Sequence, residues 1–316
     1  MNEFELIEKI VALLGDTTHG DGVDVGPGDD AALLSIDADE QLVVTTDVVI
    51  EGTHFPPRSR GDLVGYRAVA VNLSDIAAMG ANPRFVTVAL TFDRVDDEWL
   101  EGFAKGVAFC ASKHGVKVVG GNIARGSLSV AVTAIGVVPG GQSLLRSTAR
   151  SGDDIYVTGI IGAASAAVRD GVKIPELELE ELLLRRVDDM SCRYFLPVPQ
   201  LKMGIALRGV ASAAIDISDG LVADLGHLTR LSGVGAEIEL GSVPVWKSLD
   251  SNIAINASDD YELLFTAPPQ AHERIMGLAA EVSTDTTRIG KVTDGEAVMV
   301  NGVDHRVALP KGYRHF

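Results

Sequence analysis

The alternation of two kinds of apolar pattern is the feature that most constrains the fold of this chain. Short runs rich in β-branched residues, which are typical of strands, alternate with longer stretches in which apolar residues recur at helical spacing. In the first half the predicted elements are 2–14 (helix), 42–50 (strand), 63–79 (helix), 85–92 (strand), 99–114 (helix), 116–119 (strand) and 130–138 (strand). The chain is therefore expected to pack helices and strands together.

The alternation pauses around Pro139-Gly140-Gly141 and resumes near Gly152, where a second unit begins. Its predicted elements are 155–158 (strand), 162–169 (helix), 176–190 (acidic helix), 213–217 (strand), 219–231 (helix) and 237–240 (strand), followed by closing strands and one helix. Two successive units of this kind indicate an α/β (α+β) fold with two domains. We expect the first domain to span residues 1–148 and the second to span residues 149–316.

The charge balance and the cysteines argue against several classes of protein. Asp and Glu number 44 against 27 Lys and Arg, so the formal net charge is −17 and the chain would repel nucleic acid. A phosphorylated ligand would have to be admitted by metal ions, local arginines and backbone N–H groups. Cys110 and Cys192 each stand alone, so neither a disulfide framework nor a zinc site is indicated.

The sequence shows no sign of a membrane segment or of a targeting signal. Its N-terminal region lacks a basic segment followed by an apolar run, and no stretch approaches the roughly 18 uninterrupted apolar residues of a membrane span. We therefore expect a cytoplasmic protein without a membrane partner.

Five acidic loops are the candidates for metal-binding chemistry. They are Gly28-Asp29-Asp30, Thr45-Thr46-Asp47, Asn72-Leu73-Ser74-Asp75, Asp216-Ile217-Ser218-Asp219-Gly220 and Ser258-Asp259-Asp260-Tyr261-Glu262. Magnesium prefers hard oxygen ligands and commonly bridges one or two carboxylates to substrate phosphates. Taken singly, an aspartate beside a glycine is more often part of a turn or a helix N-cap, and Asp219, which precedes a helical run, fits a cap well.

Three of these carboxylates are harder to explain as turns or caps. Asp216 follows the apolar strand residues 213–215, and Asp47 is flanked by the apolar residues of the strand over 42–50. Asp75 lies inside an otherwise apolar helical stretch, where an unpaired buried charge would be costly. We therefore favour metal ligation over a structural role for these three residues.

Three further features are candidates for contact with phosphate groups. Gly120-Gly121 follows the strand over 116–119, and glycines there let backbone N–H groups approach phosphate oxygens, although no Walker lysine or G-x-G-x-x-G pattern accompanies them. Arg146 could bind a phosphate through two N–H groups or cover a surface carboxylate. His54 could hold a phosphate or hydrogen-bond a turn. No Ser/His/Asp or Cys/His arrangement is recognisable, and phosphoryl transfer needs none, because positioning and charge neutralisation suffice.

A series of motifs runs through nearly the whole chain. In order, they are GDDAA (28–32), TTDVVIEGTHF (45–55), NLSDIAAMGA (72–81), GGN (120–122), LLRSTA (144–149), AIDISDGLVADL (214–225), DYELLFT (260–266) and KGYRHF (311–316). By these motifs the chain resembles the thiamine-monophosphate kinase family. That family belongs to a wider ATP-binding group with aminoimidazole ribonucleotide synthetase and selenophosphate synthetase.

The resemblance implies an enzyme and a reaction. ATP would donate its γ-phosphoryl group to the phosphate of thiamine monophosphate by direct in-line attack, with magnesium as a cofactor, giving thiamine diphosphate and ADP. The resemblance also implies a homodimer in which the N-terminal sheets of two subunits join, while a C-terminal α/β domain completes each active site.

The resemblance further implies roles for individual residues, by matching positions. The expected magnesium-site residues are Asp30, Thr45, Thr46, Asp47, Asp75, Asn122, Asp216 and Asp219. The expected nucleotide-binding residues are Gly121, Asn122, Arg146 and Ser218. The expected substrate-binding residues are His54, Asp259 and Tyr313.

The chain departs from the family pattern at two places. Asn122 stands where the family usually has aspartate, and residues 257–261 read ASDDY where the family usually reads GGEDY. An amide thus replaces a carboxylate, and Asp259 is one methylene shorter than glutamate.

Two alternatives therefore stay open: a catalytically impaired nucleotide-binding relative, and another ATP-dependent member of the same group. A selenophosphate synthetase would need a reactive cysteine near the N-terminus, whereas the first cysteine here is Cys110.

Overall fold

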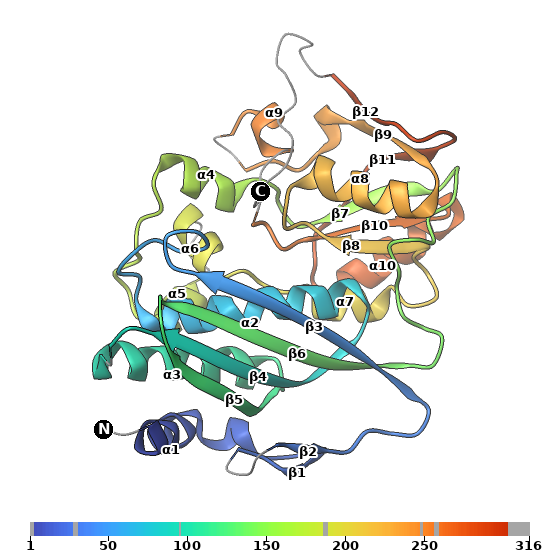
Figure 1. Cartoon of the computed structure of the whole chain (residues 1–316). Helices are drawn as coiled ribbons and strands as arrows, with labels where there is room; N and C mark the ends of the chain where they lie inside the picture. Colours follow the sequence, from blue (N-terminus) through green and yellow to red (C-terminus); the bar gives the residue numbers. More distant parts are fainter. Residues whose placement is uncertain are drawn as a thin grey trace.

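The computed structural model contains two mixed sheets with a helix between them (Figure 1). It describes residues 3–27, 31–94, 96–185, 189–246, 249–255 and 259–302. The sheet of β3, β4, β5 and β6 is called the N sheet below, and the sheet of β7 to β12 is called the C sheet. The prediction of an α/β (α+β) fold is confirmed, and each half contains one mixed sheet.

The N sheet has the strand order β3-β6-β4-β5, and only the β4–β5 pair is parallel. Its strands are β3 (Glu40–Ile50), β4 (Asn82–Phe92), β5 (Lys117–Arg125) and β6 (Ser129–Pro139). One face of the sheet is covered by α2 (Gly61–Ala78), which in turn packs on α3 (Asp97–Lys113). The first helix, α1 (Glu3–Leu14), packs against α3, and a short 3₁₀ helix (Gly15–Thr18) leads from it to a small hairpin of β1 (Val23–Val25) and β2 (Leu33–Leu34).

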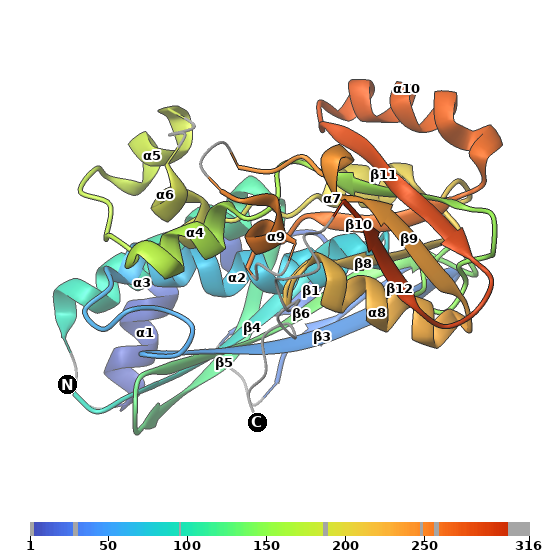
Figure 2. The same ribbon diagram turned by 90° about the horizontal axis from the view of Figure 1, so that it is seen from above.

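The C sheet has the strand order β12-β9-β11-β7-β10-β8. Its strands are β7 (Asp154–Thr158), β8 (Ala213–Asp216), β9 (Gly235–Glu239), β10 (Leu263–Ala267), β11 (Thr286–Thr293) and β12 (Val298–Asn301). One face packs on α8 (Leu221–Ser232), and the other packs on α7 (Leu201–Ala206) and α10 (His272–Val282). Figure 2 shows α4 (Ala163–Asp170), α5 (Leu179–Arg185) and α6 (Met190–Phe195) grouped beside α2. A last short helix, α9 (Ser251–Ala254), lies near α4.

Helix α2 is the central element of the molecule, because it contacts α3, the N sheet, β8 and α7. Every residue of α2 except Asp75 is buried. A helix that is apolar on all sides is typical of such a position. Its approach to α3 is close, since a Cβ atom on Gly65 would lie 2.3 Å from the Phe103 carbonyl oxygen, and one on Gly106 would lie 2.0 Å from the Asp62 carbonyl oxygen. The exception, Asp75, is therefore held at a fixed point by a rigid helix.

The predicted helices and strands of the first half are found close to their predicted positions, but one detail differs. The predicted strand over 116–119 continues as β5 through Gly120, Gly121 and Asn122, so the glycine pair does not form a loop after the strand. Parallel pairing with β4 outweighs the low strand propensity of glycine. At Gly121 this pairing requires glycine, because a Cβ would lie 1.9 Å from the Val88 carbonyl oxygen.

In the second half, the acidic helix predicted over 176–190 is instead two shorter helices, α5 and α6. Asp189 caps α6, since its side chain accepts the backbone N–H groups of Ser191 and Cys192. The prediction that Asp219 caps the following helix is also wrong, because α8 begins at Leu221 with Gly220 as its N-cap and without a side-chain cap. Within the described residues, no helix is both long and apolar enough to cross a membrane.

Candidate functional site

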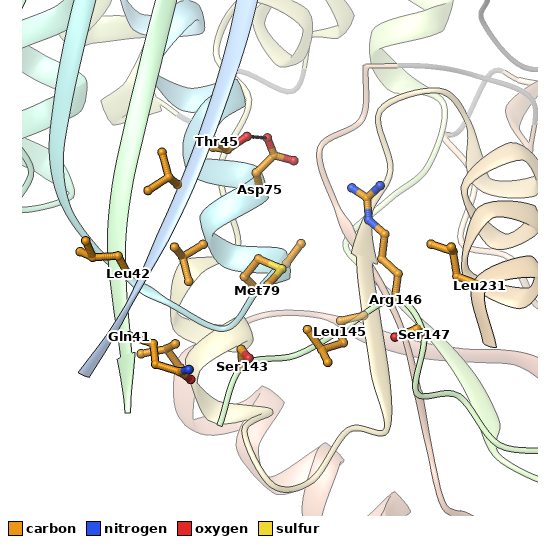
Figure 3. Close-up of a pocket in the computed structure, with 15 residues that line it drawn as sticks. Gln41, Leu42, Thr45, Asp75, Met79, Ser143, Leu145, Arg146, Ser147 and Leu231 are labelled. Atoms are coloured by element: carbon orange, nitrogen blue, oxygen red, sulfur yellow. Dashed lines mark hydrogen bonds between the residues drawn. The ribbon is translucent and has the colours of Figure 1, made fainter. Parts of the chain in front are cut away.

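A cavity of about 620 Å³ lies where β3, the end of α2 and the segment before β7 meet (Figure 3). Met79, Leu145 and Leu231 give it an apolar part, while Thr45, Asp75 and Arg146 add polar groups. Figure 3 shows the Arg146 guanidinium on the side of the cavity opposite Thr45 and Asp75. A space of this size, with apolar walls and a few polar groups, is typical of a site for a small organic ligand.

Two hydrogen bonds fix the acidic part of β3 against α2. The Thr45 hydroxyl donates to the Asp75 carboxylate over 2.6 Å, and the backbone N–H of Asp47 donates to the Asn72 side-chain oxygen over 3.0 Å. Desolvation, followed by the Asp75 charge, raises the pKa of Asp47 to about 6. Asp47 and Asp75 are therefore close enough to repel each other, and an ion that accepts both carboxylates would relieve that repulsion.

The acidic end of β8 is attached to the same stretch of α2. Asp216, with 3% of its surface exposed, accepts the Ser74 hydroxyl over 2.8 Å. Desolvation and then the Asp75 charge raise the pKa of Asp216 well above its ordinary value, whereas Arg146 opposes this shift. Desolvation also raises the pKa of Asp75. Carboxylates from β3, α2 and β8 thus share one region, as the sequence predicted for Asp47, Asp75 and Asp216.

The residues present fit a magnesium ion. Magnesium is bound by hard oxygen ligands, usually one or two carboxylates together with water and phosphate oxygens. The three aspartates supply such oxygens from rigid elements, and burial together with their mutual repulsion makes their ionised state unfavourable without a cation. Among the described residues, Arg146 is the cation whose charge acts on Asp75 and Asp216, so a negatively charged ligand would need additional positive charge.

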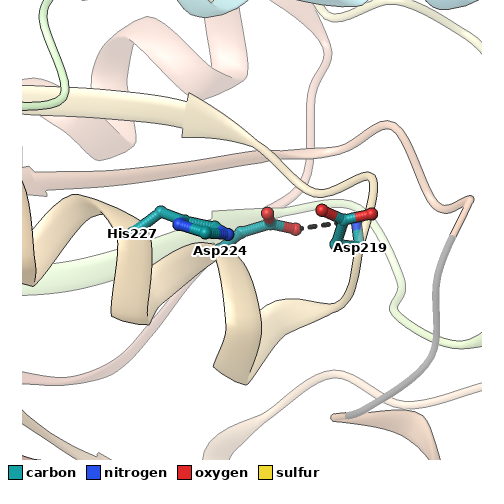
Figure 4. A group of neighbouring side chains, drawn as sticks. All are labelled: Asp219, Asp224 and His227. Atoms are coloured by element: carbon teal, nitrogen blue, oxygen red, sulfur yellow. Dashed lines mark hydrogen bonds between the residues drawn. The ribbon is translucent and has the colours of Figure 1, made fainter. Parts of the chain in front are cut away.

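A second acidic group lies in the loop between β8 and α8. One Asp224 carboxylate oxygen accepts the backbone N–H groups of Ser218, Asp219 and Gly220 at 3.0 to 3.1 Å. Desolvation, and then the Asp219 charge, raise the pKa of Asp224 to about 7. Asp219, Asp224 and His227 present possible ligand atoms within 4.8 Å of one another (Figure 4). The hydrogen bonds show that Asp224 shapes the loop in which Ser218 and Asp219 lie.

The expected substrate-binding residues His54 and Asp259 lie on separate segments, which Tyr194 and Arg67 connect. The ring Nδ1 of His54 accepts the backbone N–H of Ile50 over 3.1 Å, and the His54 carbonyl oxygen accepts the Tyr194 hydroxyl over 2.6 Å. The Asp259 carboxylate accepts a guanidinium N–H of Arg67 and, over 3.2 Å, the Tyr261 hydroxyl. Burial raises the pKa of Tyr261, and the charges of Asp259, Asp216 and Asp47 raise it further. Tyr261 therefore connects the Asp259 segment to the acidic cluster.

Three expected site residues are not part of this cluster. The Thr46 hydroxyl shares a hydrogen bond of 2.8 Å with that of Thr133 on the opposite face of the N sheet from Asp47. Gly121 lies on β5, where it pairs with Val88 of β4. Strand β5 is three strands away from β3, which carries Asp47, and this separation is about 14 Å at the usual strand spacing. Asn122 is exposed on the same edge strand. Asp30 and Tyr313 lie outside the described residues.

Arg67 and Asp224 were not identified as site residues from the sequence, and Asn72 and Ser74 were named only as neighbours of Asp75 in an acidic loop. Arg67 is a charged residue in α2, where every residue except Asp75 is buried. A buried arginine usually has a partner, so this position could have been identified from the sequence. The partners themselves are far away in the sequence, since Asp259 is 192 positions from Arg67 and Asp216 is 142 positions from Ser74. No local pattern indicates such pairs.

Comparisons with known proteins cover both halves of the chain. Residues 28–138 match the family model of the AIR synthase related protein, N-terminal domain, and residues 150–301 match that of the C-terminal domain. Thiamine-monophosphate kinase from Haemophilus influenzae is 34% identical over 337 aligned residues, covering all of this chain and 98% of the relative.

Two solved structures are similar over nearly the full length. The crystal structure of thiamine-monophosphate kinase from Stenotrophomonas maltophilia K279a superimposes with a TM-score of 0.84 and 39% identity, covering 96% of this chain and 97% of that one. The structure described as AaThiL complexed with AMPPCP and TMP superimposes with a TM-score of 0.75 and 30% identity, covering 100% and 99%. The similarity therefore includes both sheets and the region between them.

Proposed function

The chain belongs to the thiamine-monophosphate kinase family, whose two halves are AIR synthase related domains, and from this premise we propose that it phosphorylates thiamine monophosphate with ATP. The products are thiamine diphosphate and ADP. The reaction is a direct in-line transfer of the γ-phosphoryl group, in which no residue forms a covalent intermediate.

One observation carries this proposal: three aspartates from three different elements meet beside a cavity that also contains an arginine. Asp47, Asp75 and Asp216 come from β3, α2 and β8, and the charge of Asp75 acts on both of the others. Metaphosphate-like transfer depends on positioning and on neutralising the phosphate charge. A cluster of carboxylates can serve this purpose only together with cations, so its presence supports a magnesium-dependent kinase.

The nucleotide is assigned to the cavity between β3 and the segment that carries Arg146. Its apolar part can accept an adenine ring, and Arg146 can donate to phosphate oxygens. Magnesium, held by Asp47, Asp75 and Asp216, would supply positive charge between the phosphates. Thr45 orients the Asp75 carboxylate by its hydrogen bond, while Asp224 holds the backbone of the loop with Ser218 and Asp219.

We assign the acceptor to the side of the cluster formed by His54 and Asp259, following the resemblance, with Tyr313 as a third expected contact. Asp30 and Thr46 remain proposed magnesium-site residues on the same basis. This arrangement places Tyr261 between the acceptor side and the acidic cluster, consistent with its interactions with Asp216 and Asp47.

Within one chain, Gly121 and Asn122 are three strands from Asp47. They can therefore join the same site only from another subunit. We propose a homodimer formed through the open face of the N sheet. On β3 this face presents Leu42, Val44, Val48 and Ile50, which are 38 to 60% exposed. Strand β4 is not an edge of the N sheet, since it lies between β5 and β6 and buries Phe85 and Leu90.

The proposed function is tested by measuring ADP release from purified protein with ATP, magnesium and thiamine monophosphate. Free thiamine is the control acceptor, and excess EDTA removes magnesium. We expect turnover with thiamine monophosphate, little with thiamine, and none with EDTA. Equal rates with both acceptors would contradict the assignment of the acceptor. Nucleotide binding without turnover would instead support a catalytically impaired relative.

A further inference from the structure

Arg67 is the least expected residue in the interior of this protein. It lies in the middle of α2 with 1% of its side chain exposed. Its guanidinium carbon lies 4.2 Å from the centre of the Tyr194 ring and 5.5 Å from the centre of the Tyr261 ring. A buried arginine between two aromatic rings has few orientations available, so its N–H groups point in fixed directions.

Those N–H groups reach two separate parts of the chain. One donates to the Tyr194 carbonyl oxygen on α6, and another donates to the Asp259 carboxylate in the segment before β10. Burial alone would disfavour the charge, but the Asp259 carboxylate helps to raise the pKa of Arg67 above its ordinary value. Arg67 is therefore a permanent cation that joins α2 to a segment of the C-terminal half.

The segment that receives this contact has an unusual backbone. Asp259 and Tyr261 both have positive φ angles, of 67° and 53°, which side-chain-bearing residues rarely adopt. Backbone hydrogen bonds hold this conformation, from the Asp259 N–H to the Ser218 carbonyl and from the Tyr261 N–H to the Ile217 carbonyl, both over 2.8 to 2.9 Å. Such conformations persist only where surrounding contacts determine them, and they are common at functional sites.

Tyr194 extends the same connection to the other acceptor residue. Its ring packs on the Arg67 guanidinium, while its hydroxyl donates to the His54 carbonyl oxygen over 2.6 Å. His54 and Asp259 lie more than 200 positions apart in the sequence, yet both are linked to Arg67. Asp259 contacts it directly, and His54 contacts it through Tyr194.

We propose that Arg67 is a positioning residue for acceptor binding: it sets the Asp259 carboxylate directly and the His54 segment through Tyr194. The inference rests on the proposed function, in which these two residues bind thiamine monophosphate. On the nucleotide side, Ser218 touches this network through the Asp259 backbone N–H, whereas Arg146 forms no hydrogen bond with Arg67, Tyr194 or Asp259 in the described part of the chain.

The test compares Michaelis constants for the two substrates in Arg67→Lys. Lysine keeps the charge, but it lacks the planar fork and the reach to contact both partners. We expect the KM for thiamine monophosphate to rise about 10-fold or more, as for loss of a hydrogen bond between charged groups, while the KM for ATP changes less than about 2-fold. A purely structural role would lower the active fraction, and hence the maximal rate, and leave both constants unchanged.

The compensating variant combines Arg67→Lys with Asp259→Glu. The added methylene restores the reach that lysine lacks, so the double variant should bind thiamine monophosphate better than either single variant. Additive losses would overturn the proposal, because they would show that the two side chains act independently.

Tyr194→Phe keeps the test decisive if the buried arginine cannot be replaced without unfolding. It removes only the hydroxyl that donates to the His54 carbonyl and should raise the KM for thiamine monophosphate about 3-fold or more. Tyr156→Phe is the matched control, since Tyr156 lies on β7 of the C sheet and its hydroxyl interacts with His272 at the start of α10, 3.1 Å away and outside the network. Unchanged KM values in Tyr194→Phe, or equal effects of the two tyrosine variants, would overturn the inference.

Absence of wild-type turnover would contradict the proposed function and the acceptor role of Arg67 together, whereas normal wild-type turnover with unaffected variants contradicts the inference alone.

Discussion

At the scale of single residues, the site is a set of carboxylates in positions that are unfavourable for the fold alone. Asp216 is buried, and both desolvation and the neighbouring Asp75 raise its pKa well above the ordinary value. A raised pKa in the folded state means that the folded protein favours the protonated form. The ionised form therefore costs stability at neutral pH, and this cost increases as the pH rises. Strongly shifted pKa values of this kind cluster at functional sites.

Asp216→Asn separates these two contributions. The amide oxygen can still accept the Ser74 hydroxyl, while the buried negative charge is removed. We expect turnover to fall by roughly 100-fold or more, because several kcal/mol of metal-dependent stabilisation is lost. In EDTA, the midpoint of thermal unfolding should be unchanged or higher than in the wild type.

The control for this variant is Asp93→Asn, which changes a carboxylate that is 77% exposed. It should leave both turnover and unfolding unaltered. The assignment would be refuted by an Asp216→Asn protein that loses stability while its folded fraction turns over normally, since the carboxylate would then be structural.

At the scale of elements, α2 connects the acidic cluster to the rest of the fold. Asn72, Ser74 and Asp75 lie within one turn of α2 and contact β3 and β8, so any shift of α2 moves all three. The position of α2 depends in turn on close packing against α3 through glycines. The geometry of the site should therefore be sensitive to side-chain atoms that are added at this helix interface.

Gly106→Ala tests this dependence. The added Cβ would lie 2.0 Å from the Asp62 carbonyl oxygen, so the two helices must separate, at a cost of about 1 to 3 kcal/mol. Gly277→Ala on α10 is the matched control, because no atom lies within 4 Å of its Cβ and an exposed helix interior gains about 0.5 to 1 kcal/mol from alanine. Urea unfolding should show opposite shifts of the midpoint. Shifts in the same direction would mean that the α2–α3 contact is not tight.

The sequence predicted most of these elements, because periodicity depends on local patterns. It predicted Asp47, Asp75 and Asp216 as a group because an aspartate inside an apolar run is conspicuous. It failed where distant contacts decide the outcome: pairing with β4 extends β5 across Gly120-Gly121, and Arg67 finds its partner 192 positions away. Periodicity also could not show that β3 and β5 lie at the edges of the N sheet, or that β3 has exposed apolar side chains on its open face.

At the scale of the whole molecule, the N sheet has one covered face and one open face. Helix α2 covers the face that carries Val49 and Asp47, while alternate residues of β3 leave Val44 and Val48 on the other face, 60% and 45% exposed. An apolar sheet face of this kind is a common interface between copies of a chain. The proposed homodimer would bury it.

Val48→Lys tests the dimer by placing a charge on this face. The wild type should sediment as a dimer at micromolar concentration, and Val48→Lys should sediment as a monomer, because burying an unpaired charge is costly. Leu184→Lys changes an even more exposed apolar side chain, 84% exposed on α5, and should leave the dimer intact. An active wild-type monomer would exclude the dimer as a requirement of the site.

The central claim is that this site transfers the γ-phosphoryl group of ATP to the phosphate of thiamine monophosphate. The most direct measurement follows that group in ATP labelled with ³²P at the γ position, incubated with the protein, magnesium and thiamine monophosphate. The account predicts that all label leaving ATP appears in the terminal phosphate of thiamine diphosphate, in equal amount to the ADP formed. ADP released with the label in inorganic phosphate, or label found in any product other than thiamine diphosphate, would contradict it.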